Sequence, residues 1–306
     1  MVARARIRQP AKRVDEGLSV DATGVGMRRA YGTSVVGSHD QFAAADDRWN
    51  AAIAAHALLR VVQSPDDFDA IVFDMGGVFM VPNPLVVGEA IRDRGVEVDL
   101  AVSSAADAHY QGVRGITELL ATQTVEEADL DVWLPYDRRW LRAFGLTGAT
   151  LDAAVEARNQ ARRDGTAVHK VWNHTLDHNI DAFHRIAASF ATAIVSNNDG
   201  TAIDQCRRFG ICQQEPGGPL PQVSAIIDSG AVGTAKPDPA IFAPALDRLA
   251  TDPARTLYVG DTVHADVLGA TRAGLPVVQL DPLDLHRDHD HWRLPDLVAL
   301  AEALGA

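Results

Sequence analysis

The chain has few cysteines, a shortage of basic side chains and no long apolar run. Its only two cysteines, Cys206 and Cys212, are too few for a disulfide framework and are typical of a reduced, cytoplasmic protein. The 28 Lys and Arg residues face 41 Asp and Glu residues, and the net charge of −13 argues against nucleic acid or an anionic membrane as a main partner. No apolar stretch reaches membrane-spanning length. A local cluster of cations could still bind a phosphorylated small molecule.

The length of 306 residues allows one large domain or two smaller ones, and a hydrophobic content of 47% allows a substantial core. Residues 1–65 form an N-terminal extension. Basic residues near its start predict a flexible tail. Residues 41–62 then carry apolar side chains at helical spacing, which predicts an amphipathic helix that packs on the core or on a second subunit. A homodimer could form through this helix or through an inserted helical domain.

An aspartate that directly follows a predicted buried strand is the most informative feature. Residues 70–73 are all apolar, and Asp74 comes next, followed by Gly76 and Gly77. A short apolar run closed by two glycines predicts a strand that is buried on both faces and ends in a sharp turn. Ligands of open parallel sheets bind at the carboxyl ends of strands. Asp74 is therefore a candidate site residue, and the alternative is an aspartate that only caps a turn.

Two later segments add polar groups at the ends of further elements. The apolar residues 193–195 lead to Ser196 and Asn197, whose hydroxyl and backbone N–H groups could cradle a phosphoryl oxygen. Lys236 precedes Pro237, and Asp238 is a predicted helix N-cap. A lysine with so little local freedom is suited to fixing a positive charge beside an anion. Each segment alone also fits an ordinary strand exit or a solvated surface lysine.

The fourth segment carries two carboxylates after another predicted strand. Residues 257–259 are apolar, Asp261 follows Gly260, and Asp266 lies on the first turn of a predicted helix that ends near Gly274. Carboxylates that gather at one sheet edge repel each other unless a cation lies between them. Mg²⁺ prefers such oxygen ligands and keeps several waters. The alternative for Asp266 is a charge at a helix N-terminus.

The order of these four segments resembles the motif order of the haloacid dehalogenase-like superfamily over about residues 66–300. The resemblance implies an α/β fold, with a Rossmann-like parallel sheet, helices on both of its faces and a helical cap domain. The core would comprise residues 66–84 and 190–306, and the cap residues 85–189. It also implies a hydrolase that acts on a small phosphorylated metabolite. The implied catalytic residues are Asp74, as covalent nucleophile, Ser196 and Lys236. The phosphoryl group would be bound by Ser196, Asn197 and Lys236. Mg²⁺ would be bound by Asp74, the backbone carbonyl of Gly76, Asp261 and the nearby Asp266.

One position departs from the pattern of the family's phosphatases. They usually carry a second aspartate two residues after the nucleophile as general acid and base, and this chain has Gly76 there. Loss of a proton donor costs on the order of 10²–10⁴-fold in rate when the leaving group is an alkoxide. Three explanations remain open: a leaving group that departs easily, a proton donor elsewhere such as His264 or a cap residue, or phosphate binding with little turnover, as in a sensor. A haloacid dehalogenase is a further alternative, because a halide leaves without a proton. Such an enzyme needs no metal, however, so the carboxylates of Asp261 and Asp266 would have no cation to neutralise them.

More than a hundred residues separate Asp74 from Ser196, and they read as helices over residues 85–95, 99–111, 115–122, 126–144 and 150–163. This insertion is the predicted cap, which would exclude water and select the substrate. Its arginine and tryptophan side chains could contact a leaving group, although most of them fit a tryptophan core with arginines in solvent. The histidine pair His174 and His178 has no third ligand nearby in sequence, and His286, His289 and His291 fit a solvated loop better than a metal site. The candidate cap contacts are Arg114, Trp133, Arg138, Arg139, Trp140 and Arg142.

Overall fold

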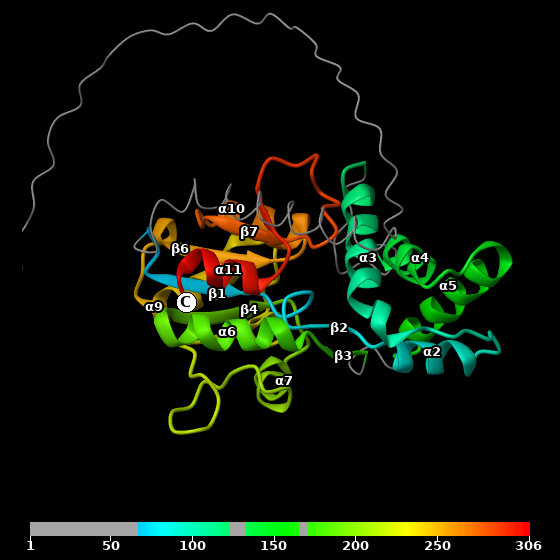
Figure 1. Cartoon of the computed structure of the whole chain (residues 1–306), viewed down its shortest axis with the longest axis horizontal. Helices are drawn as coiled ribbons and strands as arrows, with labels where there is room; N and C mark the ends of the chain where they lie inside the picture. Colours follow the sequence, from blue (N-terminus) through cyan, green and yellow to red (C-terminus); the bar gives the residue numbers. More distant parts are fainter. Residues whose placement is uncertain (1–66, 123–132, 166–170) are drawn as a thin grey trace, which may run out of the picture. The chain divides into compact units, whose positions relative to one another are not determined.

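The computed structural model describes residues 67–122, 133–165 and 171–306 (Figure 1). The predicted N-terminal tail and the amphipathic helix over residues 41–62 lie outside the described residues. The main sheet has six strands in the order β5-β4-β1-β6-β7-β8, and every neighbouring pair in it is parallel. Its strands are β1 (Ala70–Phe73), β4 (Ala191–Ser196), β5 (Ile226–Asp228), β6 (Thr256–Gly260), β7 (Val277–Leu280) and β8 (Trp292–Leu294).

Successive residues of β1 point to opposite faces of the sheet, and helices cover both faces. Phe73 packs in the cluster that contains Phe183 of α6 (Asp177–Ser189) and residues of α11 (Leu297–Leu304) and α7 (Ala202–Arg208). Val72 packs on the other side with Phe242 and with residues of α9 (Ala243–Leu249) and α10 (Gly269–Arg272). The predicted α/β fold, with a parallel sheet between two helical layers, is confirmed. Short helices complete this part: α8 (Ser229–Val232), the 3₁₀ turns Pro239–Phe242 and Pro253–Arg255, and the π-helix Val263–Leu268.

The insertion after β1 forms a helical bundle with its own core, as the predicted cap requires. The chain enters it through β2 (Met80–Pro82) and leaves through β3 (Trp172–Thr175), which pair as a separate antiparallel ribbon that the sequence had not indicated. The bundle core contains Val113, Tyr136 and Trp140. Its helices are α2 (Pro84–Arg92), the 3₁₀ turn Val102–Ser104, α3 (Ala105–Leu120), α4 (Trp133–Ala143) and α5 (Gly148–Arg163).

Two predictions about the insertion need correction. The helices expected over residues 99–111 and 115–122 are one continuous helix, α3. Gly112 and Gly115 lie within this helix and face α4. A Cβ atom at Gly112 would collide with the Tyr136 side chain, and one at Gly115 with the backbone of Pro135, so the two glycines allow α4 to approach closely. In addition, α6 falls in the range 85–189 assigned to the cap, but its apolar face packs against the sheet, so by packing it belongs to the core.

The loop that follows β1 is fixed by contacts from three directions. Gly77 N donates to the Met80 carbonyl, and the Gly77 carbonyl accepts from the Tyr110 hydroxyl at 2.7 Å. The buried Asn179 side chain donates to the Val78 carbonyl and accepts from Leu297 N, which ties the loop to α6 and α11. No helix among the described residues has both the length and the apolar character to cross a bilayer.

Gly77 provides a test of how tightly this loop is built. Its φ angle is +66°, and a Cβ atom there would overlap the carboxylate of Asp261 at the end of β6. Gly77→Ala should lower the free energy of unfolding by about 2–5 kcal/mol, because it combines a left-handed backbone cost of about 1–2 kcal/mol with overpacking of about 1–3 kcal/mol. Gly145 has φ +85° and open space at its Cβ position, so Gly145→Ala isolates the backbone cost. Denaturant unfolding measures both; equal losses would contradict the proposed overlap.

Candidate active site

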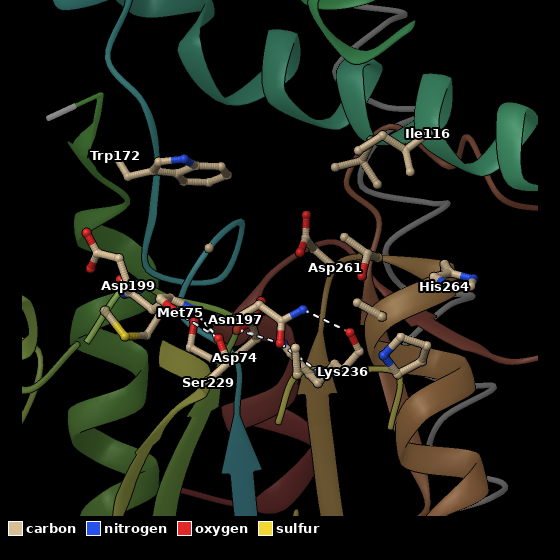
Figure 2. Close-up of a pocket in the computed structure, with 18 of the residues that line it drawn as sticks. Asp74, Met75, Ile116, Trp172, Asn197, Asp199, Ser229, Lys236, Asp261 and His264 are labelled. Atoms are coloured by element: carbon tan, nitrogen blue, oxygen red, sulfur yellow. Dashed lines mark hydrogen bonds and ion pairs between the residues drawn. The ribbon is translucent and has the colours of Figure 1, made fainter. Parts of the chain in front are cut away.

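A cavity of about 900 Å³ lies where the carboxyl ends of β1, β4 and β6 face the cap helices (Figure 2). The register explains the convergence: Phe73 is level with Ile194 of β4 and with Val259 of β6, so the polar residues just beyond these positions leave the sheet at one edge. Asp74, Gly76, Ser196, Asn197, Lys236 and Asp261 all line the cavity.

Lys236 is the centre of the charged network on the floor of the cavity. Its Nζ lies 2.8 Å from Asp74 Oδ1 and 2.7 Å from Asp266 Oδ1, and it donates to the Tyr258 hydroxyl at 2.9 Å. The Lys236 side chain is 1% exposed. Burial alone would lower the pKa of Lys236, but the two carboxylates outweigh burial and raise it, so the ammonium group stays charged.

The Lys236 backbone is positioned by the residue that follows β4. Lys236 N donates to Asn197 Oδ1 at 2.8 Å, and Asn197 Nδ2 donates to the Lys236 carbonyl at 3.0 Å. The side chain of Asn197 therefore holds the lysine segment in place. Ser196 is 4% exposed at the last position of β4 and faces the same cavity. The phosphoryl-binding roles of Ser196 and Asn197 remain predictions.

Asp266 is completely buried and accepts hydrogen bonds on both carboxylate oxygens. Oδ1 accepts from Tyr258 as well as Lys236, and Oδ2 accepts from Asp261 N and from the backbone and hydroxyl groups of Thr262. Burial would raise the pKa of Asp266, but Lys236 and Thr262 outweigh it and lower the pKa. Asp266 thus orients Lys236 and the turn after β6, and a metal ion would compete with these donors for its oxygens.

The other two carboxylates are less well compensated. Burial raises the pKa of Asp74 to about 7, against the opposing charge of Lys236, and burial also raises the pKa of Asp261. Apart from its ion pair with Lys236, the buried Asp74 Oδ1 has no hydrogen-bond donor among the described residues. Asp74, Asp261 and Asp266 each place an oxygen within 4.8 Å of the others. Three buried carboxylates and one lysine leave excess negative charge, and the hard oxygen donors suit Mg²⁺.

A cap histidine that the sequence had not singled out reaches this carboxylate cluster. His109 of α3 lies with Nε2 2.8 Å from Asp261 Oδ2 and with Nδ1 2.8 Å from the Tyr136 hydroxyl, and it is 2% exposed. If Asp261 is ionised, Nε2 donates to it and Nδ1 of a neutral ring accepts from Tyr136. The sequence placed His109 in the insertion, but only the fold brings α3 over β6.

The position of Gly76 is covered by an aromatic ring. A Cβ atom at Gly76 would lie 3.2 Å from Cζ3 of Trp172 on β3, which is tight contact. Figure 2 shows the Trp172 ring on the cap side of the cavity, above Asp74. The structure therefore places an indole where a side chain at position 76 would project.

The remaining candidates differ in their environments. His264 lines the cavity, and burial lowers its pKa. Among the described residues, the only group of metal-ligating side chains is the aspartate cluster, so neither His174 nor His178 joins one. His286 is 2% exposed and contacts Thr117 of α3, so the prediction of a solvated loop is wrong for His286.

None of the candidate cap arginines, Arg114, Arg138, Arg139 and Arg142, lines the cavity. Arg114 bonds to the Leu285 carbonyl and to Asp288, which joins α3 to the loop after β7. Arg138 pairs with Asp152 and Arg139 with Glu118. Trp140 is fully buried in the cap core, whereas Trp133 lines the cavity. Of the tryptophans proposed as cap contacts, Trp133 is therefore the one that lines the cavity.

Known proteins share parts of this sequence and its fold. A glyceraldehyde 3-phosphate phosphatase from Methanopyrus kandleri is 40% identical over 55 residues, 18% of this chain and 24% of the relative. A phosphoserine phosphatase from Thermus thermophilus is 41% identical over 87 residues, 26% of this chain and 34% of the relative. The matches therefore span about a quarter to a third of the length of these curated relatives.

Solved structures cover more of the chain at lower identity. The magnesium-bound HAD-hydrolase YfnB from Bacillus subtilis has a TM-score of 0.50 at 18% identity, covering 78% of this chain and 99% of that one. A 2-haloacid dehalogenase from Pseudomonas syringae has a TM-score of 0.45 at 21% identity, and the match covers 78% of this chain and 98% of the dehalogenase. The family model of haloacid dehalogenase-like hydrolases matches residues 68–274, from just before β1 to just after α10. The chain belongs to the haloacid dehalogenase-like hydrolases.

Proposed function

We propose that this hydrolase is a Mg²⁺-dependent phosphatase that transfers the phosphoryl group of a small metabolite to Asp74 before hydrolysis. The observation that carries the proposal is the buried contact between Asp74 and Lys236 within a cluster of three carboxylates. A carboxylate can attack phosphorus only where positive charge offsets the repulsion between two anions. The phosphatase names of the curated relatives support the same reaction class.

The proposed reaction has two displacements. In the first, an oxygen of Asp74 forms a bond to phosphorus while the bond from phosphorus to the leaving-group oxygen breaks, and the electron pair departs with that oxygen. Lys236 balances charge on the phosphoryl oxygens, and the Ser196 hydroxyl donates to one of them. In the second, water attacks phosphorus and passes a proton to solvent, while the bond from phosphorus to the Asp74 oxygen breaks, its electron pair returns to the Asp74 carboxylate and inorganic phosphate leaves.

The metal would be held by Asp74, Asp261 and the backbone carbonyl of Gly76, with Asp266 beside them. When bound, Mg²⁺ would supply positive charge to the phosphoryl oxygens. This need for a cation also separates the proposal from a haloacid dehalogenase, which uses no metal and would leave the carboxylate cluster uncompensated. A phosphate sensor without turnover remains the contrasting outcome. A screen of phosphate esters, acyl phosphates and 2-haloacids, each with and without Mg²⁺, distinguishes the three.

Asp74→Asn tests the nucleophile. The amide keeps the shape of the side chain but cannot form an acyl phosphate by the same route, so kcat for any phosphate substrate should fall by at least about 10³-fold. Asp247 lies exposed on α9, and Asp247→Asn is a matched charge-removing control that should keep wild-type kcat. Released phosphate measures both variants. Full turnover by Asp74→Asn would rule out the assigned nucleophile.

Asp261→Asn tests the metal site with a readout that does not depend on turnover. Mg²⁺ that binds the folded chain should raise the melting temperature of the wild type, and a chelator should reverse the shift. The variant should lose most of this shift and bind Mg²⁺ at least about tenfold more weakly in calorimetry, because one anionic ligand is gone. The Asp247→Asn chain again serves as control. An unchanged Mg²⁺ response in Asp261→Asn would contradict the assignment.

A further inference from the structure

Resting on the proposed phosphatase activity, we infer that the leaving group is aromatic and that the preferred substrate is the phosphate monoester of a phenol-type alcohol. Two separate features lead to this substrate class. One is the composition of the cap side of the cavity, and the other is the absence of an acidic side chain at position 76. The cap-side wall, here called the aromatic roof, consists of Met80, Val113, Ile116, Trp133, Tyr136 and Trp172.

The aromatic roof carries no formal charge. Among the described cap residues, His109 is the one ionisable side chain besides Tyr136 that reaches into the cavity, and both of its ring nitrogens already have partners. None of the described cap arginines lines the cavity: Arg158 and Arg162 pair with the buried Asp137, and Arg114 pairs with Asp288. A carboxylate or second phosphate that pointed at the roof would lose its hydration without gaining a cation. An apolar group would instead be favoured there.

The rings of the roof are held in fixed orientations. Trp133 meets Tyr136 edge to face, with ring centroids 5.3 Å apart, and the guanidinium of Arg162 lies 5.2 Å from the Trp133 ring centroid. Trp172 meets His109 edge to face at 5.4 Å. Ordered rings can receive a planar ligand in stacked or edge-to-face geometry at little entropic cost. Figure 2 shows Trp172 and Ile116 on the cap side, opposite the floor that holds Asp74 and Lys236.

The chemistry at position 76 favours the same leaving group. In the first displacement the bond from phosphorus to the aryl oxygen breaks, its electron pair stays on the phenolate oxygen, and solvent protonates that oxygen after release. A phenol ionises near pH 10, whereas water, whose acidity is close to that of an alcohol, ionises near pH 15.7. A phenolate therefore departs without the acid that Gly76 cannot supply. The Trp172 ring covers the place where such an acid would project and can contact the departing ring instead.

Two phosphonates separate recognition of the ring from leaving-group chemistry, because neither has a bond that can be hydrolysed. The full-length chain is assayed with Mg²⁺ and acetyl phosphate as substrate, and phenylphosphonate and methylphosphonate are tested as competitive inhibitors. Phenylphosphonate should bind about tenfold more tightly or better, since stacking and apolar burial act on it alone. In turnover, phenyl phosphate should exceed ethyl phosphate in kcat/KM by at least about 10²-fold.

Trp133→Leu removes a roof ring and keeps apolar volume. It should weaken phenylphosphonate at least about fivefold and leave methylphosphonate within about twofold, whereas Leu85→Ala, on the exposed side of α2, should change neither. The inference is overturned if the two phosphonates bind the wild type equally, if Trp133→Leu weakens both alike, or if phosphoserine exceeds phenyl phosphate in kcat/KM. If acetyl phosphate is not hydrolysed, the proposed function fails, and calorimetric binding of the two phosphonates still decides the inference.

Discussion

The site depends on one lysine buried among carboxylates. Lys236 lies within 2.8 Å of both Asp74 and Asp266, in surroundings where an unpaired charge is costly. Asp266 is satisfied by the lysine, a tyrosine and the turn after β6, so it serves mainly to hold the cation in place. Asp74 and Asp261 keep an excess of negative charge that a further cation or a bound proton can balance. That imbalance makes the pocket suitable for a divalent metal and, with it, for a phosphoryl group.

The cap and the core meet through specific polar contacts. His109 joins α3 to Asp261, Tyr110 joins the same helix to the loop after Asp74, and Arg114 joins it to the loop after β7. The contacts of His109 and Tyr110 involve the loops that carry the proposed metal ligands. The position of α3 of the cap is therefore coupled to the positions of Asp261 and of the loop that follows Asp74. The cap side of the cavity is apolar and aromatic, whereas the sheet side is charged.

The sequence allowed the sheet side to be predicted because its signals are local. An apolar run followed by Asp74, and another followed by Asp261, identify strand ends, and parallel pairing brings strand ends to one edge. The family membership and the α/β fold follow from the same segments and are confirmed. The proximity of Asp74 and Lys236 also agrees with that reasoning. Their catalytic roles remain proposals.

The cap side could not be predicted in the same way, because its contacts depend on helix packing over long sequence separations. His109 is 152 positions away from Asp261, and nothing in its neighbours marks it as part of the site. Two separate helices were predicted over residues 99–111 and 115–122, whereas Gly112 and Gly115 lie inside one helix, α3, and allow α4 to pack closely against it. Trp172 lies over Gly76 only because β3 pairs with β2. His286 was expected in solvent and is buried because α3 packs over its loop.

The most direct test of the account is to identify the residue that carries the phosphoryl group during turnover. The wild-type chain would be mixed with acetyl phosphate and Mg²⁺, quenched in acid within the first turnover, digested and analysed by tandem mass spectrometry. The account predicts one acid-stable, hydroxylamine-sensitive phosphoryl group on Asp74. A chain that turns over substrate with no modification, or with the phosphoryl group on Ser196 or His109, would contradict it.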